Sequence, residues 1–184
     1  MSIFENRAVA AAVRTDEDFF AALNSKVDVI FLLYSNIMTI GDQIDKAHKH
    51  NKKVLIHMDF TEGIGKDRAA LHFIKKQGAD GILTTKTSMI RPAKELGLVT
   101  VQRFFIVDSH SVDTAVDSIR IAKPDVVEIM PGVVCKKIKE FASKVVGTPI
   151  LAGGLIEFRE DVDNAIEAGA MAVSTANREL WNYR

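Results

Sequence analysis

The sequence has one cysteine, one tryptophan and no excess of either charge. A single thiol, Cys135, excludes an intramolecular disulfide and is typical of proteins in a reducing compartment. Lysine plus arginine and aspartate plus glutamate number 24 each, which excludes a broadly basic surface but not a local basic patch. No uninterrupted apolar run approaches the roughly 18 residues of a membrane span, and the apolar start is too interrupted for a signal peptide. We therefore expect a cytoplasmic protein with no membrane association.

Strand-like and helix-like segments alternate along the chain without a linker or a low-complexity stretch. With 184 residues, 47% of them hydrophobic, the chain fits one domain over residues 1–184. Seven helices are expected between the strands, the fourth with Pro92 in its first turn, and a short helix follows the last strand. Eight strands are expected, at residues 8–13, 27–33, 53–58, 81–84, 98–102 or 98–104, 126–129, 150–152 and 171–174.

This order predicts a compact α/β fold, a (β/α)8 TIM-type barrel. The barrel would be small for its class, since such barrels usually need about 250 residues. An open doubly wound sheet is the alternative fold. The sequence favours the barrel because no G-x-G-x-x-G segment follows the first strand, as a dinucleotide-binding sheet would require.

The segment from Thr148 to Thr175 has the strongest local signal, a strand–helix–strand unit with small residues at the end of each strand. Gly153 and Gly154 follow the first of these strands, and Ser174 and Thr175 end the second. In barrels of this type the last two strand-to-helix loops commonly hold a phosphate group. These four residues therefore predict a phosphate site, although a tight turn and a helix N-cap would explain them without a ligand.

Alternation along two other strands directs polar side chains into the barrel. In KVLIHMD the apolar alternate positions suit the helix-facing side, which leaves His57 and Asp59 pointing toward the mouth. In DVVEIM the same reasoning points Glu128 inward. A carboxylate is almost never buried unpaired, so Glu128 predicts a cation, a hydroxyl donor or a ligand beside it. His57 equally fits a core histidine with a structural partner.

Two cations near strand ends are candidate anion contacts. Lys86 follows the fourth strand in the segment LTTK, where it could bind an anion or simply start the next helix. Arg103 has no assigned direction: if Gln102 points inward, Arg103 faces a helix, unless the strand ends there and the side chain turns over the rim. An arginine at the rim could bind a phosphate or pair with Glu128 or Asp108. The histidine spacing has no metal-ligand pattern, so we predict no metal site.

Six blocks of the sequence resemble one family of bacterial regulators. In chain order they are HMDFTEG, DGILTTK, QRFFIVD, DVVEIMPG, ILAGGLI and GAMAVSTANRELW, and together they span nearly the whole chain. They resemble the glycerol uptake operon antiterminator regulatory proteins, cytoplasmic proteins that respond to glycerol 3-phosphate and act on leader mRNA. The resemblance implies a barrel without catalytic residues or cofactor that senses this metabolite at the four predicted phosphate residues. It also implies three acceptors for the glycerol hydroxyls, His57, Asp59 and Glu128.

Two functions of different classes stay open. The resemblance favours a regulator that senses glycerol 3-phosphate, binds leader mRNA and promotes antitermination of glycerol-utilisation genes. The residues alone slightly favour an enzyme of lyase or isomerase type on a small phosphorylated substrate, with Glu128 or Asp59 as general base. No known RNA-recognition motif is present, and the lysine-rich segments 46–53 and 136–144 are expected to be solvated. A homodimer would double such a basic patch.

Overall fold

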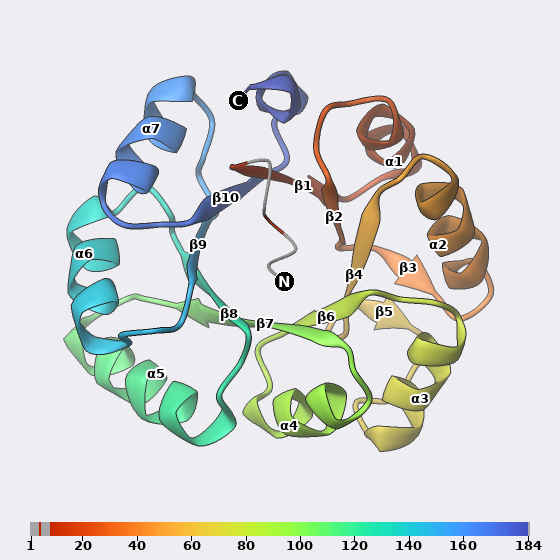
Figure 1. Ribbon diagram of the computed structural model, residues 1–184, viewed down its shortest axis with the longest axis horizontal. Helices are drawn as coiled ribbons and strands as arrows, with labels where there is room; N and C mark the ends of the chain where they lie inside the picture. The colour runs from red at the N-terminus through yellow and green to blue at the C-terminus, as the bar shows by residue number, and fades with distance from the viewer. Residues whose placement is uncertain (1–3, 5–7, 184) are drawn as a thin grey trace.

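Eight parallel strands close into a barrel that seven helices surround (Figure 1). The computed structural model describes residue 4 and residues 8–183. In this part of the chain the barrel order is β1-β10-β9-β8-β7-β6-β4-β2. The strands are β1 Val9–Val13, β2 Val29–Leu32, β4 Lys53–His57, β6 Gly81–Thr84, β7 Val99–Phe105, β8 Val126–Met130, β9 Ile150–Gly153 and β10 Ala172–Thr175. All neighbours pair in parallel, so the carboxyl ends of the strands meet at one rim. The predicted TIM-type (β/α)8 barrel is confirmed.

Several helices begin at a side chain that caps their first turn. Thr15 Oγ1 accepts from the Asp18 amide at 3.1 Å, and Asp67 Oδ1 accepts from the Ala70 amide at 2.9 Å. The described helices are α1 Asp16–Leu23, α2 Ile40–Lys49, α3 Arg68–Lys76, α4 Thr87–Glu95, α5 Ser109–Ala122, α6 Cys135–Lys144 and α7 Arg159–Glu167, with the 3-10 helix η1 Arg178–Asn182 after β10. None of them is long and apolar enough to cross a membrane.

The position predicted for Pro92 is wrong. This residue is the sixth of α4, so it lies in the second turn and not in the first. A proline there removes one helical hydrogen bond. Met89, Ile90 and Ala93 are buried on both sides of it, so packing against the barrel holds the helix together across the proline.

A second, two-stranded sheet joins the loops that follow β2 and β4. Its strands, β3 Ser35–Asn36 and β5 Thr61–Glu62, pair in parallel. No pattern in the sequence predicts this sheet, because two-residue strands carry no periodicity. It ties two loops together above neighbouring barrel strands, since β2 pairs with β4.

Alternate residues of the barrel strands divide the core into two parts. One part lies between the strands and the helices. The other fills the barrel near the amino ends of its strands, where Phe4 meets Phe31 edge-on with 6.3 Å between ring centroids. Because this interior layer is wholly apolar, the polar chemistry of the barrel is confined to the carboxyl ends of the strands.

Candidate functional site

Four buried polar side chains form a hydrogen-bonded chain across the barrel, toward the carboxyl ends of its strands. They come from β4, β7, β8 and β10 and are His57, Arg103, Glu128 and Ser174. Arg103 Nε donates to Glu128 Oε2 at 2.5 Å, and Ser174 Oγ donates to Glu128 Oε1 at 2.5 Å. Arg103 Nη1 lies 3.2 Å from His57 Nε2. Glu128 therefore has both a cation and a hydroxyl donor, as its complete burial requires.

Arg103 points into the barrel. Gln102 faces the helices instead, where its Nε2 donates to Thr87 Oγ1 at 2.9 Å and to Ser118 Oγ at 3.0 Å. The condition under which Arg103 would face a helix, an inward Gln102, is therefore not met, and Arg103 pairs with Glu128, one of the alternatives that the sequence left open. Alternation could not decide between the two, because β7 carries long polar side chains at consecutive positions that suit either face.

His57 is a neutral hydrogen-bond acceptor. Burial lowers the pKa of His57 to about 4, and the Arg103 guanidinium adds to this effect while Asp59 opposes it. Because a guanidinium can only donate, Nε2 is the acceptor and Nδ1 carries the proton. Nδ1 is buried and has no partner among the described residues. The ring stacks on Phe60 with 4.4 Å between centroids and 14° between planes.

Asp59 is held by the last residue of β6 and the residue that follows it. Thr84 Oγ1 donates to its Oδ1 at 2.9 Å, and the Thr85 amide and hydroxyl donate to Oδ2 at 2.7 and 3.0 Å. Partial burial would raise the pKa of Asp59, but these hydrogen bonds lower it below its ordinary value. Lys86, next in the chain, is exposed and its amide donates to Thr84 Oγ1 at 3.1 Å. No three His, Cys, Asp or Glu side chains in the described chain are grouped as metal ligands.

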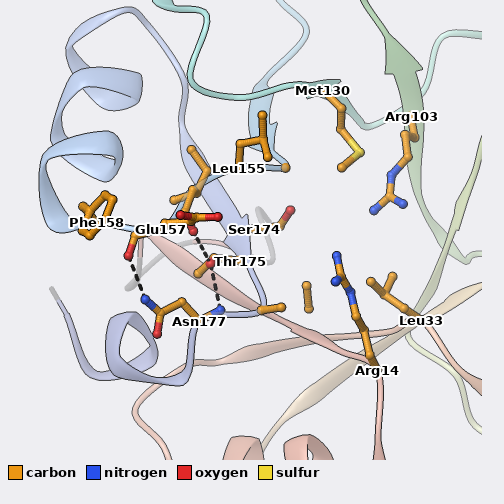
Figure 2. A pocket seen from close by; sticks show the side chains of 14 residues that line it. Arg14, Leu33, Arg103, Met130, Leu155, Glu157, Phe158, Ser174, Thr175 and Asn177 are labelled. Carbon is orange, nitrogen blue, oxygen red and sulfur yellow. Dashed lines mark hydrogen bonds between the residues drawn. The ribbon is translucent and has the colours of Figure 1, made fainter.

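A cavity of about 510 Å³ opens at the carboxyl ends of β1, β9 and β10 (Figure 2). Arg14 follows β1, and Figure 2 shows its guanidinium directed toward that of Arg103 across the cavity. Within the described chain no carboxylate forms an ion pair with the Arg14 side chain. The wall therefore presents two guanidinium groups, of which that of Arg103 is paired with Glu128.

Three of the four predicted phosphate residues line this cavity, namely Gly154, Ser174 and Thr175. Gly153 lies beneath its wall: a Cβ there would be 2.5 Å from Glu128 Oε1 and 2.7 Å from Ser174 Oγ. Lys86, His57, Asp59 and Glu128 are not part of the lining. The structure thus brings the closing strands and Arg103 to one cavity and leaves the other predicted residues outside it.

The hydroxyl hydrogens of this wall are already used within the protein. Thr175 Oγ1 donates to the Ile156 carbonyl at 2.6 Å, as Ser174 Oγ does to Glu128. Among the described residues, the backbone amides of Leu155 and Ile156 donate to no protein acceptor, whereas the β9–β10 register directs the Gly154 amide to the Ser174 carbonyl. Gly154 and Leu155 have φ of 77° and 59°, which turns the chain sharply after β9. The donors available to an anion therefore include these amides and the two arginines.

Arg14 is the residue that the sequence analysis missed. It follows the expected first strand directly, so the same rule that placed Asp59 at the rim applies to it. The alanine-rich strand before it carries a weak strand signal, which hid this position.

Known proteins are similar to this chain over nearly its whole length. Residues 9–181 match the family described as glycerol-3-phosphate responsive antiterminator. The uncharacterized protein YgcP of Escherichia coli (strain K12) is 35% identical over 182 residues, which cover 98% of this chain and 95% of that protein. The crystal structure of the glycerol uptake operon antiterminator regulatory protein from Listeria monocytogenes has a TM-score of 0.93 and 30% identity, and the match covers 98% of each chain. A glycerol uptake operon antiterminator-related protein from Thermotoga maritima has a TM-score of 0.86 and 34% identity, over 95% of this chain and 98% of that one. The chain therefore belongs to the glycerol-3-phosphate responsive antiterminator family.

Proposed function

We propose that this protein senses glycerol 3-phosphate and, in response, binds leader mRNA and promotes transcription antitermination of glycerol-utilisation genes. The family description supports the effector. The observation that carries the proposal is the cavity at the closing strands, whose wall combines two arginines with the unengaged amides of Leu155 and Ile156. This is the corner of the barrel where related folds bind phosphate groups.

The phosphate would lie between Arg14, Arg103 and the amides of Leu155 and Ile156. A guanidinium matches the geometry of a phosphate because it can donate two parallel hydrogen bonds. The glycerol hydroxyls need acceptors, and Glu157 in the cavity wall offers a carboxylate. The other predicted acceptors, His57, Asp59 and Glu128, do not line the cavity. A ligand would contact them only if it extended past the residues that form the cavity wall.

A barrel enzyme is the competing function, and the state of the inward carboxylates argues against it. Both oxygens of Glu128 accept hydrogen bonds inside the protein. Asp59 accepts three, and its lowered pKa makes it a weak base at neutral pH. These contacts support a barrel that binds its ligand and leaves it unchanged.

Thermal denaturation and RNA gel shift at stated salt test the proposal. Glycerol 3-phosphate should raise the Tm without turnover and should change the affinity for leader RNA. Product formation would favour the enzyme, and an RNA affinity indifferent to glycerol 3-phosphate would refute the sensing mechanism.

A pair of glycine variants locates the effector. Gly154→Asp adds a carboxylate to the cavity wall and should abolish the Tm response. Gly147→Asp is the matched control, because Gly147 also has a positive φ, of 88°, and a Cβ there meets nothing within 4 Å. An equal Tm response in both variants would show that the phosphate binds elsewhere.

A further inference from the structure

A second cavity, of about 450 Å³, lies beside the first at the carboxyl end of β2. α1, α2 and the small β3–β5 sheet contribute its wall, and Leu33 lines both cavities. Its volume is within the range of small-molecule sites. The proposed effector binding does not use this cavity.

Aromatic rings dominate one part of the wall. Phe19 and Tyr34 lie deeper, while Phe20 and Phe60 are 56% and 61% exposed. Exposed phenylalanine rings at the edge of a cavity leave apolar area in water that a partner could cover. Flat rings of this kind are the surfaces on which unstacked bases of single-stranded nucleic acids stack.

Polar groups in the same wall include both donors and acceptors without a partner in the described chain. Asn36 Oδ1 accepts from the amides of Met38 at 2.9 Å and Thr39 at 3.1 Å, which leaves its amide nitrogen as a donor. The Lys46 ammonium and the Glu62 carboxylate form no ion pair there. A base edge presents donors and acceptors together, whereas a cationic ligand needs acceptors alone.

The remaining carboxylates of the wall are stabilised by the protein itself. Asp16 accepts from the Tyr34 hydroxyl at 2.5 Å. Asp42 lies in the first turn of α2, where the helix dipole favours a negative charge. Glu62 is thus the carboxylate most available to a base amino or imino group.

We propose that this second cavity receives an unstacked base of the single-stranded leader RNA, which contacts the rings of both Phe20 and Phe60. The inference rests on the proposed function, because it names where the RNA partner is held. Guanine, which carries both an amino group and a ring N–H, fits the carboxylate of Glu62 best, and cytosine offers its amino group alone.

The position of this cavity offers a route from the effector to the RNA. Phe60 stacks on His57, and His57 accepts from Arg103, which lines the first cavity. An anion that moves the Arg103 side chain therefore acts on the Phe60 ring, which contacts the base, through two direct contacts: Arg103 with His57, and His57 with Phe60. By linkage, RNA bound at Phe60 strengthens or weakens effector binding by the same factor.

Fluorescence anisotropy with labelled leader RNA tests the inference on the full chain. Phe20→Ala should weaken RNA binding about tenfold, the typical effect of losing one stacked base, and Phe20→Trp should retain it. Phe105→Ala is the matched control, because Phe105 is also 56% exposed but lines neither cavity. The Tm shift with glycerol 3-phosphate should be unchanged in Phe20→Ala, since Phe20 lies outside the first cavity.

The outcomes separate this inference from the proposed function. RNA binding by the wild type that survives Phe20→Ala and Phe60→Ala overturns the cavity assignment and leaves the sensor intact. No RNA binding by the wild type, with or without effector, refutes the proposed function and this inference with it. Titration of guanosine monophosphate and of free arginine, followed by NMR shifts of cavity residues, adds an independent readout: arginine binding without nucleotide binding would make this a site for cations and overturn the inference.

Discussion

Replacing Glu128 by glutamine tests whether the buried ion pair organises the barrel interior. Glutamine has nearly the same shape but no charge, so Arg103, which is only 6% exposed, would keep a charge without its counter-ion. Removing one partner of a buried pair typically costs about 3–5 kcal/mol, and glutamine keeps part of the hydrogen bonding, so we expect about 3 kcal/mol. For a domain of this size that loss lowers the Tm by about 6–12 °C.

Urea denaturation and thermal scans measure the loss, with Glu95→Gln as the matched control. Glu95 pairs with Arg68 at 3.2 Å and Arg91 at 3.5 Å on the surface, so its removal should cost less than about 1 kcal/mol. Inorganic phosphate should stabilise Glu128→Gln more than the wild type, because Arg103 then lacks its counter-charge. If Glu128→Gln and Glu95→Gln lose equal stability, the reasoning about the buried pair is wrong.

Three further outcomes are expected. The pKa of His57 is about 4 in the folded state, so the unfolded chain binds a proton first as the pH falls. The unfolding free energy should therefore drop by up to about 3 kcal/mol between pH about 6.5 and about 4. In urea denaturation, His57→Gln should flatten this pH dependence. Gly153→Ala should cost about 1–3 kcal/mol in the same assay, since its Cβ would lie 2.5 Å from Glu128 Oε1, and an unchanged midpoint would contradict this packing. Arg14→Ala should weaken glycerol 3-phosphate binding about tenfold in calorimetry, while replacement of the exposed Arg91 by alanine should not. Equal affinities of the two variants for glycerol 3-phosphate would show that Arg14 does not contact the ligand.

Local patterns were sufficient for the barrel and for part of the site. The order of apolar strands and amphipathic helices predicts a parallel α/β barrel, because alternation and periodicity act within one element at a time. The same alternation points Glu128 inward, and the small residues at the ends of β9 and β10 mark the corner where the first cavity opens. These features depend on neighbours along the chain, so the sequence by itself determined them.

The remaining features of the two cavities were decided by how the barrel closes. β7 places Gln102 and Arg103 on opposite faces, and only the packed structure shows that hydroxyls on α4 and α5 take the glutamine while Glu128 takes the arginine. Arg14 reaches the first cavity because β1 pairs with β10, and their facing residues are more than 160 positions apart in the chain. The second cavity likewise needs the β3–β5 pairing to bring Phe60 beside α1 and α2. Contacts of this kind depend on which strands close the barrel, and no local pattern carries that information.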